Sequence, residues 1–416
     1  MGIGPLLIFD KSSIQSLTVD ESVWLDAHYK GIITPLFFVE TLADLSKEMK
    51  SGRTPEDVVG NIAEKVSIGG PPNIHHSTLC LAELHGNKIE MSRRPVVGGG
   101  RQVTSGKRQG IVFEQAPEID ALQRWQNRDF LEVERRFASR WRQSLLDIDL
   151  NAIFEQGREI IKRTRRPKDL AEAKELAVQL INKPNSRYAK EAVKASLPGD
   201  QINPLMKRWQ EAGNPPLSQY APYTAHLATV DLFFCIALGA DLIGRERPSN
   251  KIDLAYLYYL PFCMAFTSRD NLHIRTVPLF LKEDQIFIHG GDLKADLAKL
   301  DVHYSQLSDE VKETGTISFA HIPPKDGDFL TSKVWDQLMA PRWREDTDPN
   351  IASMSEEDKK EIIEEINKIS KLKVSSDTYC KVNSDEVDHL LVQFKSPIFK
   401  GKWRLLPPSV EQGIKD

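Results

Sequence analysis

Acidic residues stand directly after two apolar segments that lie far apart in the chain. Asp10 ends GPLLIFD, and Asp270 follows MAFTS by two residues. Both segments are typical of buried strands, and ligands of a doubly wound sheet bind beyond the carboxyl ends of its strands, where the strand order reverses. We therefore expect Asp10 and Asp270 to face one crevice.

Two further acids belong to the same candidate cluster. Glu40 lies in the apolar run PLFFVETL, in a helix expected after a second short strand, GIIT (31–34), where a lone buried carboxylate would be costly. Asp253 opens the segment that leads into MAFTS, so its helix is expected to begin at the same edge of the sheet. Taken singly, such acids are more typical of turns, caps or helix surfaces. Together they indicate a divalent cation, which supplies the charge that mutual repulsion lacks.

The strands and helices that must hold these acids come from two distant parts of the chain. A length of 416 residues, 40% of them hydrophobic, is enough for two or three cores. The first part alternates strand and helix, and the second resumes this alternation with MAFTS and a last strand, QIFIHGG. We predict an α/β fold with a mainly helical insertion and a C-terminal extension. The predicted division is 1–60 and 220–300 for the core, 61–219 for the insertion and 301–416 for the extension.

The four acids and their neighbours resemble the PIN-like family of nucleases. The family pattern is a strand-end Asp, a Glu in the helix after the second strand, an Asp opening the helix before the fourth strand, and a strand ending in Thr or Ser, any residue, Asp. The matching segments are LLIFD with Asp10, ITPLFFVETL with Glu40, NKIDLAYLYYLPF with Asp253, and FTSRDNL with Ser268 and Asp270. The resemblance covers the two core segments, and DLAYLYYLPFCMAFTSRD is its most specific stretch.

This resemblance implies a Rossmannoid three-layer fold and hydrolysis of a phosphodiester with Mg²⁺ or Mn²⁺. By this likeness, Asp10 and Asp270 would be direct metal ligands, and Ser268 would lie near metal or phosphate. Asp253 would be a ligand or an indirect support, and Glu40 would bind water or a second metal ion. RNA is the commoner substrate of the family, and the resemblance leaves open whether single-stranded or branched DNA is also a substrate. Arg269 departs from the pattern, because many relatives carry a further acid there, and it would alter metal or phosphate contacts.

Asp231, in HLATVDLFFCIALG, competes with Asp253 for the place of the third acid. We prefer Asp253 because its helix runs directly into the strand that carries Ser268 and Asp270. The helix of Asp231 is instead followed by a polar turn, GRERPSN. Asp231 also lies in mid-helix, where indirect support is more natural than direct ligation.

The net charge of -4 gives no overall attraction for nucleic acid, so any grip must come from local patches. We expect Arg158, Lys162 and Arg165 on one face of a helix in the insertion, where they would contact phosphates. A surface for a protein partner or a second copy of the chain would lie on the insertion or on the extension. The clearest element of the extension is a helix expected over SEEDKKEIIEEINKISKL (355–372).

Several other motifs are excluded or favour a structural role. GGGRQVTSGKRQG is not a phosphate loop, because five residues instead of four separate its framing glycines. The histidines at 75, 76 and 85 favour a structural role over a metal cluster. Four scattered cysteines argue against a zinc knuckle and a disulfide framework, and fit a reducing cytoplasm. The N-terminus lacks a basic region and no run of about 18 apolar residues follows, so we expect no membrane association.

The leading hypothesis is a metal-dependent endonuclease acting on RNA or single-stranded nucleic acid, in a defence, toxin or processing role. One alternative is a PIN-like scaffold that binds nucleic acid or a partner without cleaving, but the intact acids argue against it. Another is a phosphatase with Asp10 as its nucleophile, which would want a second acid where Ser12 stands. Substitution of Asp10 or Asp270 by Asn is expected to abolish cleavage without loss of stability, because carboxylates repel each other in the absence of metal.

Overall fold

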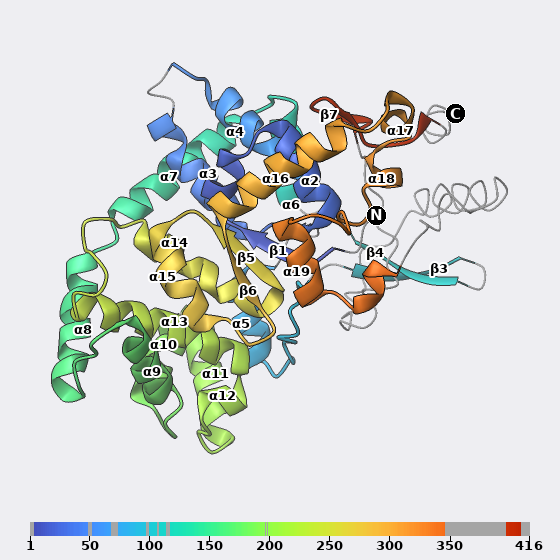
Figure 1. Ribbon diagram of the computed structural model, residues 1–416. Helices are drawn as coiled ribbons and strands as arrows, with labels where there is room; N and C mark the ends of the chain where they lie inside the picture. The colour runs from blue at the N-terminus through green and yellow to red at the C-terminus, as the bar shows by residue number, and fades with distance from the viewer. Residues whose placement is uncertain are drawn as a thin grey trace.

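The two predicted core segments meet in one sheet in the computed structural model of the chain (Figure 1). The structure describes residues 4–48, 52–67, 74–96, 100–105, 108–113, 117–195, 197, 199–345 and 397–408. The sheet has four parallel strands in the order β2-β1-β5-β6. They are β1 (Leu6–Phe9), β2 (Lys30–Ile32), β5 (Ala265–Ser268) and β6 (Ile286–His289). The predicted α/β class with a parallel sheet is therefore confirmed.

The strand order reverses between β1 and β5, in the middle of the sheet. Ile8 of β1 pairs with Ile32 of β2 on one side and with Phe266 of β5 on the other. The chain thus leaves β1 toward one edge of the sheet and later returns to its other side. Such a reversal is where α/β proteins bind ligands, and Asp10 and Asp270 both lie just beyond the ends of these two strands.

Successive strand residues enter two different cores. Ile8 and Phe266 pack into one hydrophobic core, whereas Leu7, Phe9 and Ala265 pack into the other. Because side chains alternate across a strand, the two cores lie on opposite faces of the sheet. A sheet covered on both faces favours apolar strands, which explains why β1 is a continuous apolar run. In β5 the apolar residues Ala265 and Phe266 are followed by two buried polar residues, Thr267 and Ser268, at the end of the strand that faces the acids.

The helices on the face of Leu7 and Phe9 come from all parts of the chain. They are α1 (Lys11–Ser16), α2 (Val19–His28), α3 (Pro35–Glu48), α4 (Pro55–Ala63), α6 (Pro117–Gln126), α7 (Glu132–Leu146), α16 (Gly290–Ser305) and α19 (Leu330–Leu338). Two of them begin with a capping box: Thr18 with Glu21 starts α2, and Thr54 with Asp57 starts α4.

The face of Ile8 and Phe266 is covered by a second set of helices. They are α5 (His76–Leu84), α8 (Leu150–Arg163), α9 (Leu170–Ile181), α13 (Pro222–Gly239), α14 (Asn250–Ala255), the 3₁₀ helix η2 (Tyr256–Phe262) and α15 (Asn271–Phe280). A smaller core beside them holds α10 (Arg187–Ala195), α11 (Gly199–Glu211) and α12 (Leu217–Tyr220). The helices of the predicted insertion are thus divided between both faces of the sheet.

Helix α13 is the apolar centre of this second layer. It approaches α8 so closely that a Cβ on Gly239 would lie 2.4 Å from the backbone carbon of Gly157, so both positions require glycine. In the described part of the chain, α13 is the one helix long and apolar enough to cross a membrane. However, 78% of this span is buried inside the protein, as in the core helix of a soluble protein.

The described part of the C-terminal extension packs on the core. Its elements are α17 (Asp309–Glu313), α18 (Thr316–Phe319), α19, the 3₁₀ helix η3 (Pro341–Arg344), β7 (Phe399–Lys400) and β8 (Trp403–Arg404). Trp335 donates to the carbonyl oxygen of His28, and Trp403 packs edge-on against Trp24 of α2. The predicted boundary at residue 300 falls inside α16. The helix predicted over 355–372 lies outside the described residues.

One segment of the insertion differs from the predicted pattern. The glycine-rich, basic stretch around GGGRQVTSGKRQG, where no strand was predicted, contains an antiparallel hairpin of β3 (Gly100–Ser105) and β4 (Arg108–Phe113). The hairpin projects from the body of the molecule in Figure 1. Apolar and polar residues do not alternate regularly in this stretch. A search for apolar periodicity therefore does not detect its two strands.

Candidate active site

Asp10 is almost completely buried where β1 passes into α1. Its exposed fraction is 2%, and it caps α1 by accepting a hydrogen bond from the backbone N–H of Ser13 at 2.9 Å. The hydroxyls of Ser12 and Ser268 donate to its second oxygen, Oδ2, at 2.7 and 2.6 Å. Because Ser268 ends β5, the last of these bonds joins the two central strands at their carboxyl ends.

A buried histidine of α15, His273, lies beside Asp10. Its Nδ1 is 3.5 Å from Oδ2 of Asp10 and 2.8 Å from Oγ of Ser268, and its Nε2 is 2.6 Å from the backbone carbonyl oxygen of Asp253. Ser268 gives its single proton to Asp10, so both ring nitrogens face acceptors and the ring carries two protons.

The pKa shifts agree with a buried ion pair between these two residues. Burial alone would lower the pKa of His273, but the hydrogen bond and charge of Asp10 raise it to about 9. Burial would likewise raise the pKa of Asp10, but His273, Ser268 and Ser12 hold it below its usual value. Asp10 is therefore a charged carboxylate with a cation already at its side.

Glu40 extends from α3 toward the same edge of the sheet. The backbone N–H of Lys11 and the hydroxyl of Tyr256 donate to its Oε2 at 3.2 and 2.7 Å. No hydrogen bond from the described residues reaches Oε1. Burial, followed by the charges of Asp10 and Asp253, raises the pKa of Glu40 to about 8. Its carboxyl group therefore keeps a proton at neutral pH unless a cation approaches.

Asp253 lies in the first turn of α14, and its carboxylate receives no hydrogen bond from the described residues. Burial raises the pKa of Asp253 to about 7; His273 opposes this rise, and the charges of Asp270, Asp10 and Asp44 add to it. These couplings place the Asp253 carboxylate among the other predicted acids.

Asp270 caps α15 and is half-buried. Its Oδ1 accepts a hydrogen bond from the backbone N–H of Leu272 at 2.6 Å, and its own N–H donates to Oγ of Ser268 at 2.9 Å. Its Oδ2 has no hydrogen-bond partner among the described residues. Its neighbour Arg269 is exposed and is tied to the site through its backbone N–H, which donates to the hydroxyl of Ser12.

A buried lysine, Lys11, fixes α3 against this cluster. Its exposed fraction is 1%, and its Nζ lies 2.9 Å from Asp44 and 2.6 Å from Glu48. Burial would lower the pKa of Lys11, but these two carboxylates raise it. Because Glu40, Asp44 and Glu48 are spaced by four, they share one face of α3. Lys11 therefore holds this face with its side chain while its backbone orients Glu40.

The structure thus brings Asp10, Glu40, Asp253, Ser268 and Asp270 together, although they come from opposite sides of the insertion. No three His, Cys, Asp or Glu side chains of the described residues are close enough to enclose a metal ion as they stand. The donor chemistry nevertheless fits one. Carboxylate oxygens without partners remain on three of the acids, and carboxylate oxygen is the ligand that Mg²⁺ and Mn²⁺ prefer.

Asp231, the competing third acid, belongs to a different polar cluster. It accepts hydrogen bonds from Nζ of Lys251 and from the hydroxyl of Tyr258. Tyr256, two residues earlier on η2, instead donates to Glu40. Lys251 forms an ion pair with Asp231, whereas no lysine or arginine of the described residues pairs with Asp253.

Two of the three residues of the insertion predicted to bind nucleic acid lie on α8, and the third follows the end of this helix. Arg158 and Lys162 are exposed on α8, which packs on α13 at the outer side of the helical layer (Figure 1). Arg165 is also exposed, but the expectation that it shares their helical face is wrong, because the helical backbone ends at Thr164. Lys162 pairs with Glu159 at 2.6 Å. Their binding of nucleic acid stays a prediction.

Comparison of the chain with protein-family models, with curated proteins and with solved structures found no match. Its function is therefore inferred from the geometry and chemistry of the site.

Five residues of the site were missed by reasoning from the sequence: Lys11, Asp44, Glu48, Tyr256 and His273. The four-residue spacing of Glu40, Asp44 and Glu48 was a usable signal for one acidic face of α3. His273 gave a weaker signal, because a histidine on an apolar helix is most often a core residue. Tyr256 lay inside the most specific stretch but had no marked role.

Proposed function

We propose that this chain is a metal-dependent nuclease with a PIN-like fold, and that it hydrolyses phosphodiester bonds of RNA or single-stranded nucleic acid. The observation that carries this proposal is the meeting of four carboxylates at the reversal point of a parallel sheet, two of them with raised pKa values and with oxygens that lack partners. Uncompensated carboxylates in such a place are the usual sign of a cation site.

Different acids of the site have different roles in the proposed hydrolysis. Glu40, Asp253 and Asp270 offer the oxygens that would hold Mg²⁺ or Mn²⁺, and Asp10 is held beside them by Ser12, Ser13 and Ser268. When bound, the metal would activate water and offset charge on the phosphate.

Supporting residues set the positions of these acids. Tyr256 and the backbone of Lys11 orient Glu40 through Oε2, which leaves Oε1 toward the site. His273 links Asp10 to the backbone of Asp253 and so holds β1, β5 and α14 in one arrangement. A phosphatase with Asp10 as its nucleophile is disfavoured, because the second acid that this chemistry wants two residues on is replaced by Ser12, whose hydroxyl donates to Asp10.

Cleavage assays on end-labelled RNA and single-stranded DNA test the proposal. The purified chain is expected to cleave one of them with Mn²⁺ or Mg²⁺ and to be inactive with EDTA. Equal cleavage with and without EDTA, or no cleavage of either substrate with both metals, would contradict it.

A matched pair of variants tests the choice of the third acid. Asp253→Asn is expected to lower the cleavage rate by roughly 10- to 100-fold, as for the loss of a ligand or its support. Asp231→Asn should leave the rate within about two-fold, because its partner Lys251 lies outside the carboxylate cluster. Rates are compared under identical Mn²⁺ concentrations. A dead Asp231 variant beside an active Asp253 variant would show that the wrong helix was assigned to the site.

A further inference from the structure

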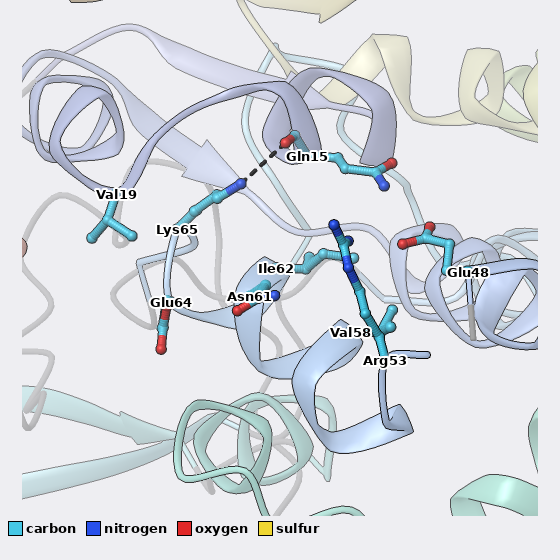
Figure 2. Close-up of a pocket in the computed structure, with 9 residues that line it drawn as sticks. All are labelled: Gln15, Val19, Glu48, Arg53, Val58, Asn61, Ile62, Glu64 and Lys65. Atoms are coloured by element: carbon cyan, nitrogen blue, oxygen red, sulfur yellow. Dashed lines mark hydrogen bonds between the residues drawn. The ribbon is translucent and has the colours of Figure 1, made fainter. Parts of the chain in front are cut away.

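A polar hollow lies at the C-terminal end of α1, the end opposite Asp10. It has a volume of about 280 Å³ and is lined by Gln15, Val19, Glu48, Arg53, Val58, Asn61, Ile62, Glu64 and Lys65. Figure 2 shows the guanidinium of Arg53 reaching between Ile62 and Glu48, and the ammonium of Lys65 pointing to the backbone of Gln15. Its walls come from α1, from the first residue of α2, from α3 and α4, and from the segments that follow α3 and α4.

The charges around this hollow leave two cations without a carboxylate partner. Glu48 is paired with the buried Lys11 at 2.6 Å, and Glu64 is paired with Arg128 at 2.5 Å. Arg53 has no ion pair or hydrogen bond from its side chain to any described residue. Among the described residues, Lys65 donates only to the carbonyl oxygen of Gln15, at 3.0 Å.

The surroundings of Lys65 also favour an anion. Burial, followed by the positive charge of Lys294, lowers the pKa of Lys65, whereas the charges of Glu21 and Glu64 oppose this fall. The ammonium group of Lys65 is therefore incompletely compensated, and an approaching anion would stabilise it.

The remaining lining residues indicate which chemical groups a ligand of this hollow would carry. Val58 and Ile62 supply an apolar wall, and the amides of Gln15 and Asn61 each offer both donors and an acceptor. An apolar wall with amides suits a base or sugar, and the cations suit a phosphate. The volume is at the lower end for ligand sites, which fits one nucleotide unit rather than a longer segment.

We propose that this hollow binds one nucleotide, with its phosphate between Arg53 and Lys65. The proposal rests on the proposed nuclease function where the nucleotide is part of the substrate strand. The hollow lies roughly 8 Å along α1 from Asp10, given a rise of about 1.5 Å per residue. Glu48 belongs to both places, because it lines the hollow and holds Lys11. A strand cleaved at the carboxylates can therefore place a neighbouring nucleotide here.

Binding measured without metal tests the hollow separately from catalysis. The full chain in EDTA is titrated with fluorescein-labelled single-stranded RNA by anisotropy, and with AMP by calorimetry, over a series of KCl concentrations. Arg53→Gln is expected to weaken RNA binding roughly 5- to 10-fold at 50 mM salt and to reduce the salt slope by about 0.7, the weight of one phosphate contact. Arg53→Lys should restore part of both, and Arg187→Gln, an exposed arginine of α10, should change neither.

The two probes distinguish the source of the nucleotide. Weaker binding of AMP as well as RNA by the Arg53→Gln variant would support a site for free nucleotides. Weaker binding of RNA alone would support a site for a flanking nucleotide of the strand. An unchanged affinity and salt slope for both probes, or no binding of either by the wild type, would overturn the proposal.

These results are separable from those on cleavage. A chain that cleaves RNA with Mn²⁺ but does not respond to Arg53→Gln keeps the nuclease function and loses the nucleotide site. A chain that binds through Arg53 but never cleaves keeps the nucleotide site and loses the nuclease function.

Discussion

Glu40→Gln is expected to make the metal-free protein more stable by roughly 1 to 3 kcal/mol at pH 8 to 9, while it lowers the cleavage rate on the order of 100-fold. The gain arises because burial and the charges of Asp10 and Asp253 oppose ionisation of Glu40. A glutamine keeps the shape and can still accept from Tyr256 and from the backbone of Lys11, and its carboxamide carries no charge. Stability and activity should therefore move in opposite directions.

The pH dependence of this gain has a definite sign. The pKa of Glu40 is about 8 in the folded chain and 4.5 in the unfolded one, so the folded state binds more protons between these values. The stability of the wild type consequently falls as pH rises from about 4.5 to 8. Glu40→Gln lacks this titration. The two proteins should be equally stable near pH 4.5 and should diverge up to about pH 8.

Urea denaturation in EDTA at several pH values measures this difference. Addition of Mg²⁺ or Mn²⁺ should stabilise the wild type and reverse the order of the two proteins, because binding to the folded state adds to stability. Glu191→Gln, at an exposed glutamate on α10, is the matched control, because it makes the same exchange away from the carboxylate cluster. A Glu40→Gln variant that is less stable than the wild type at pH 8 in EDTA would contradict the assigned repulsion.

The sheet was the part of the fold that the sequence predicted best. All four strands were expected at GPLLIFD, GIIT, MAFTS and QIFIHGG, because strands covered on both faces are continuous apolar runs between turns. Their order was not predicted; the sequence led only to the expectation that Asp10 and Asp270, at the ends of two of these strands, face one crevice. The pairing of β1 with β5 joins segments more than half the chain apart, and local pattern carries no record of such pairing.

The role of the insertion could not be predicted. Apolar periodicity indicates that 117–213 is helical, but it does not say which core each apolar face enters. Phe130 and Ala138 pack with β1 residues on one face of the sheet, whereas Leu150 and Leu176 pack on the other. The prediction of one parallel sheet with helices was confirmed, and the PIN-like assignment stays a proposal.

The candidate site was predictable in its acids but not in its cations. A carboxylate at a strand end carries a positional signal, because the carboxyl edge of a parallel sheet is a defined place. Lys11 and His273 carry no such signal, since lysine is normally exposed and a helical histidine normally packs. Both are fixed by partners distant in sequence, Lys11 by Asp44 and Glu48 and His273 by Asp10.

These cations change the expectation for Asp10. From the sequence, Asp10→Asn was expected to leave stability unchanged or to raise it, because the acids repel each other. The structure instead pairs Asp10 with buried His273, and the pKa of Asp10 is lowered. We now expect Asp10→Asn to destabilise the metal-free protein by about 3 to 5 kcal/mol, as when one partner of a buried pair is removed, and to lose cleavage on the order of 100-fold or more.

The pH dependence of this loss is opposite in sign to that of Glu40→Gln. In the wild type the pKa of His273 is raised to about 9, so its stabilisation is fully present below about pH 6.5 and is lost as pH rises through 9. Without Asp10, burial lowers the pKa of His273, and stability is lost as pH falls below 6.5. The deficit of Asp10→Asn should therefore be largest near pH 5 to 6 and should shrink toward pH 9.

A double-variant cycle isolates the pair. Asp10→Asn/His273→Gln removes both charges and leaves groups that can still hydrogen-bond to Ser268 and to the backbone of Asp253. Its loss of stability should be smaller than the sum of the two single losses by about 1 to 3 kcal/mol, because each single variant strands the other partner. Cleavage should not return, since the carboxylate is still missing. Two results would contradict the ion pair: additive losses of stability, or a loss of stability in Asp10→Asn that grows toward pH 9. Either would show that His273 is neutral and that the charges around Asp10 are only those of the other acids.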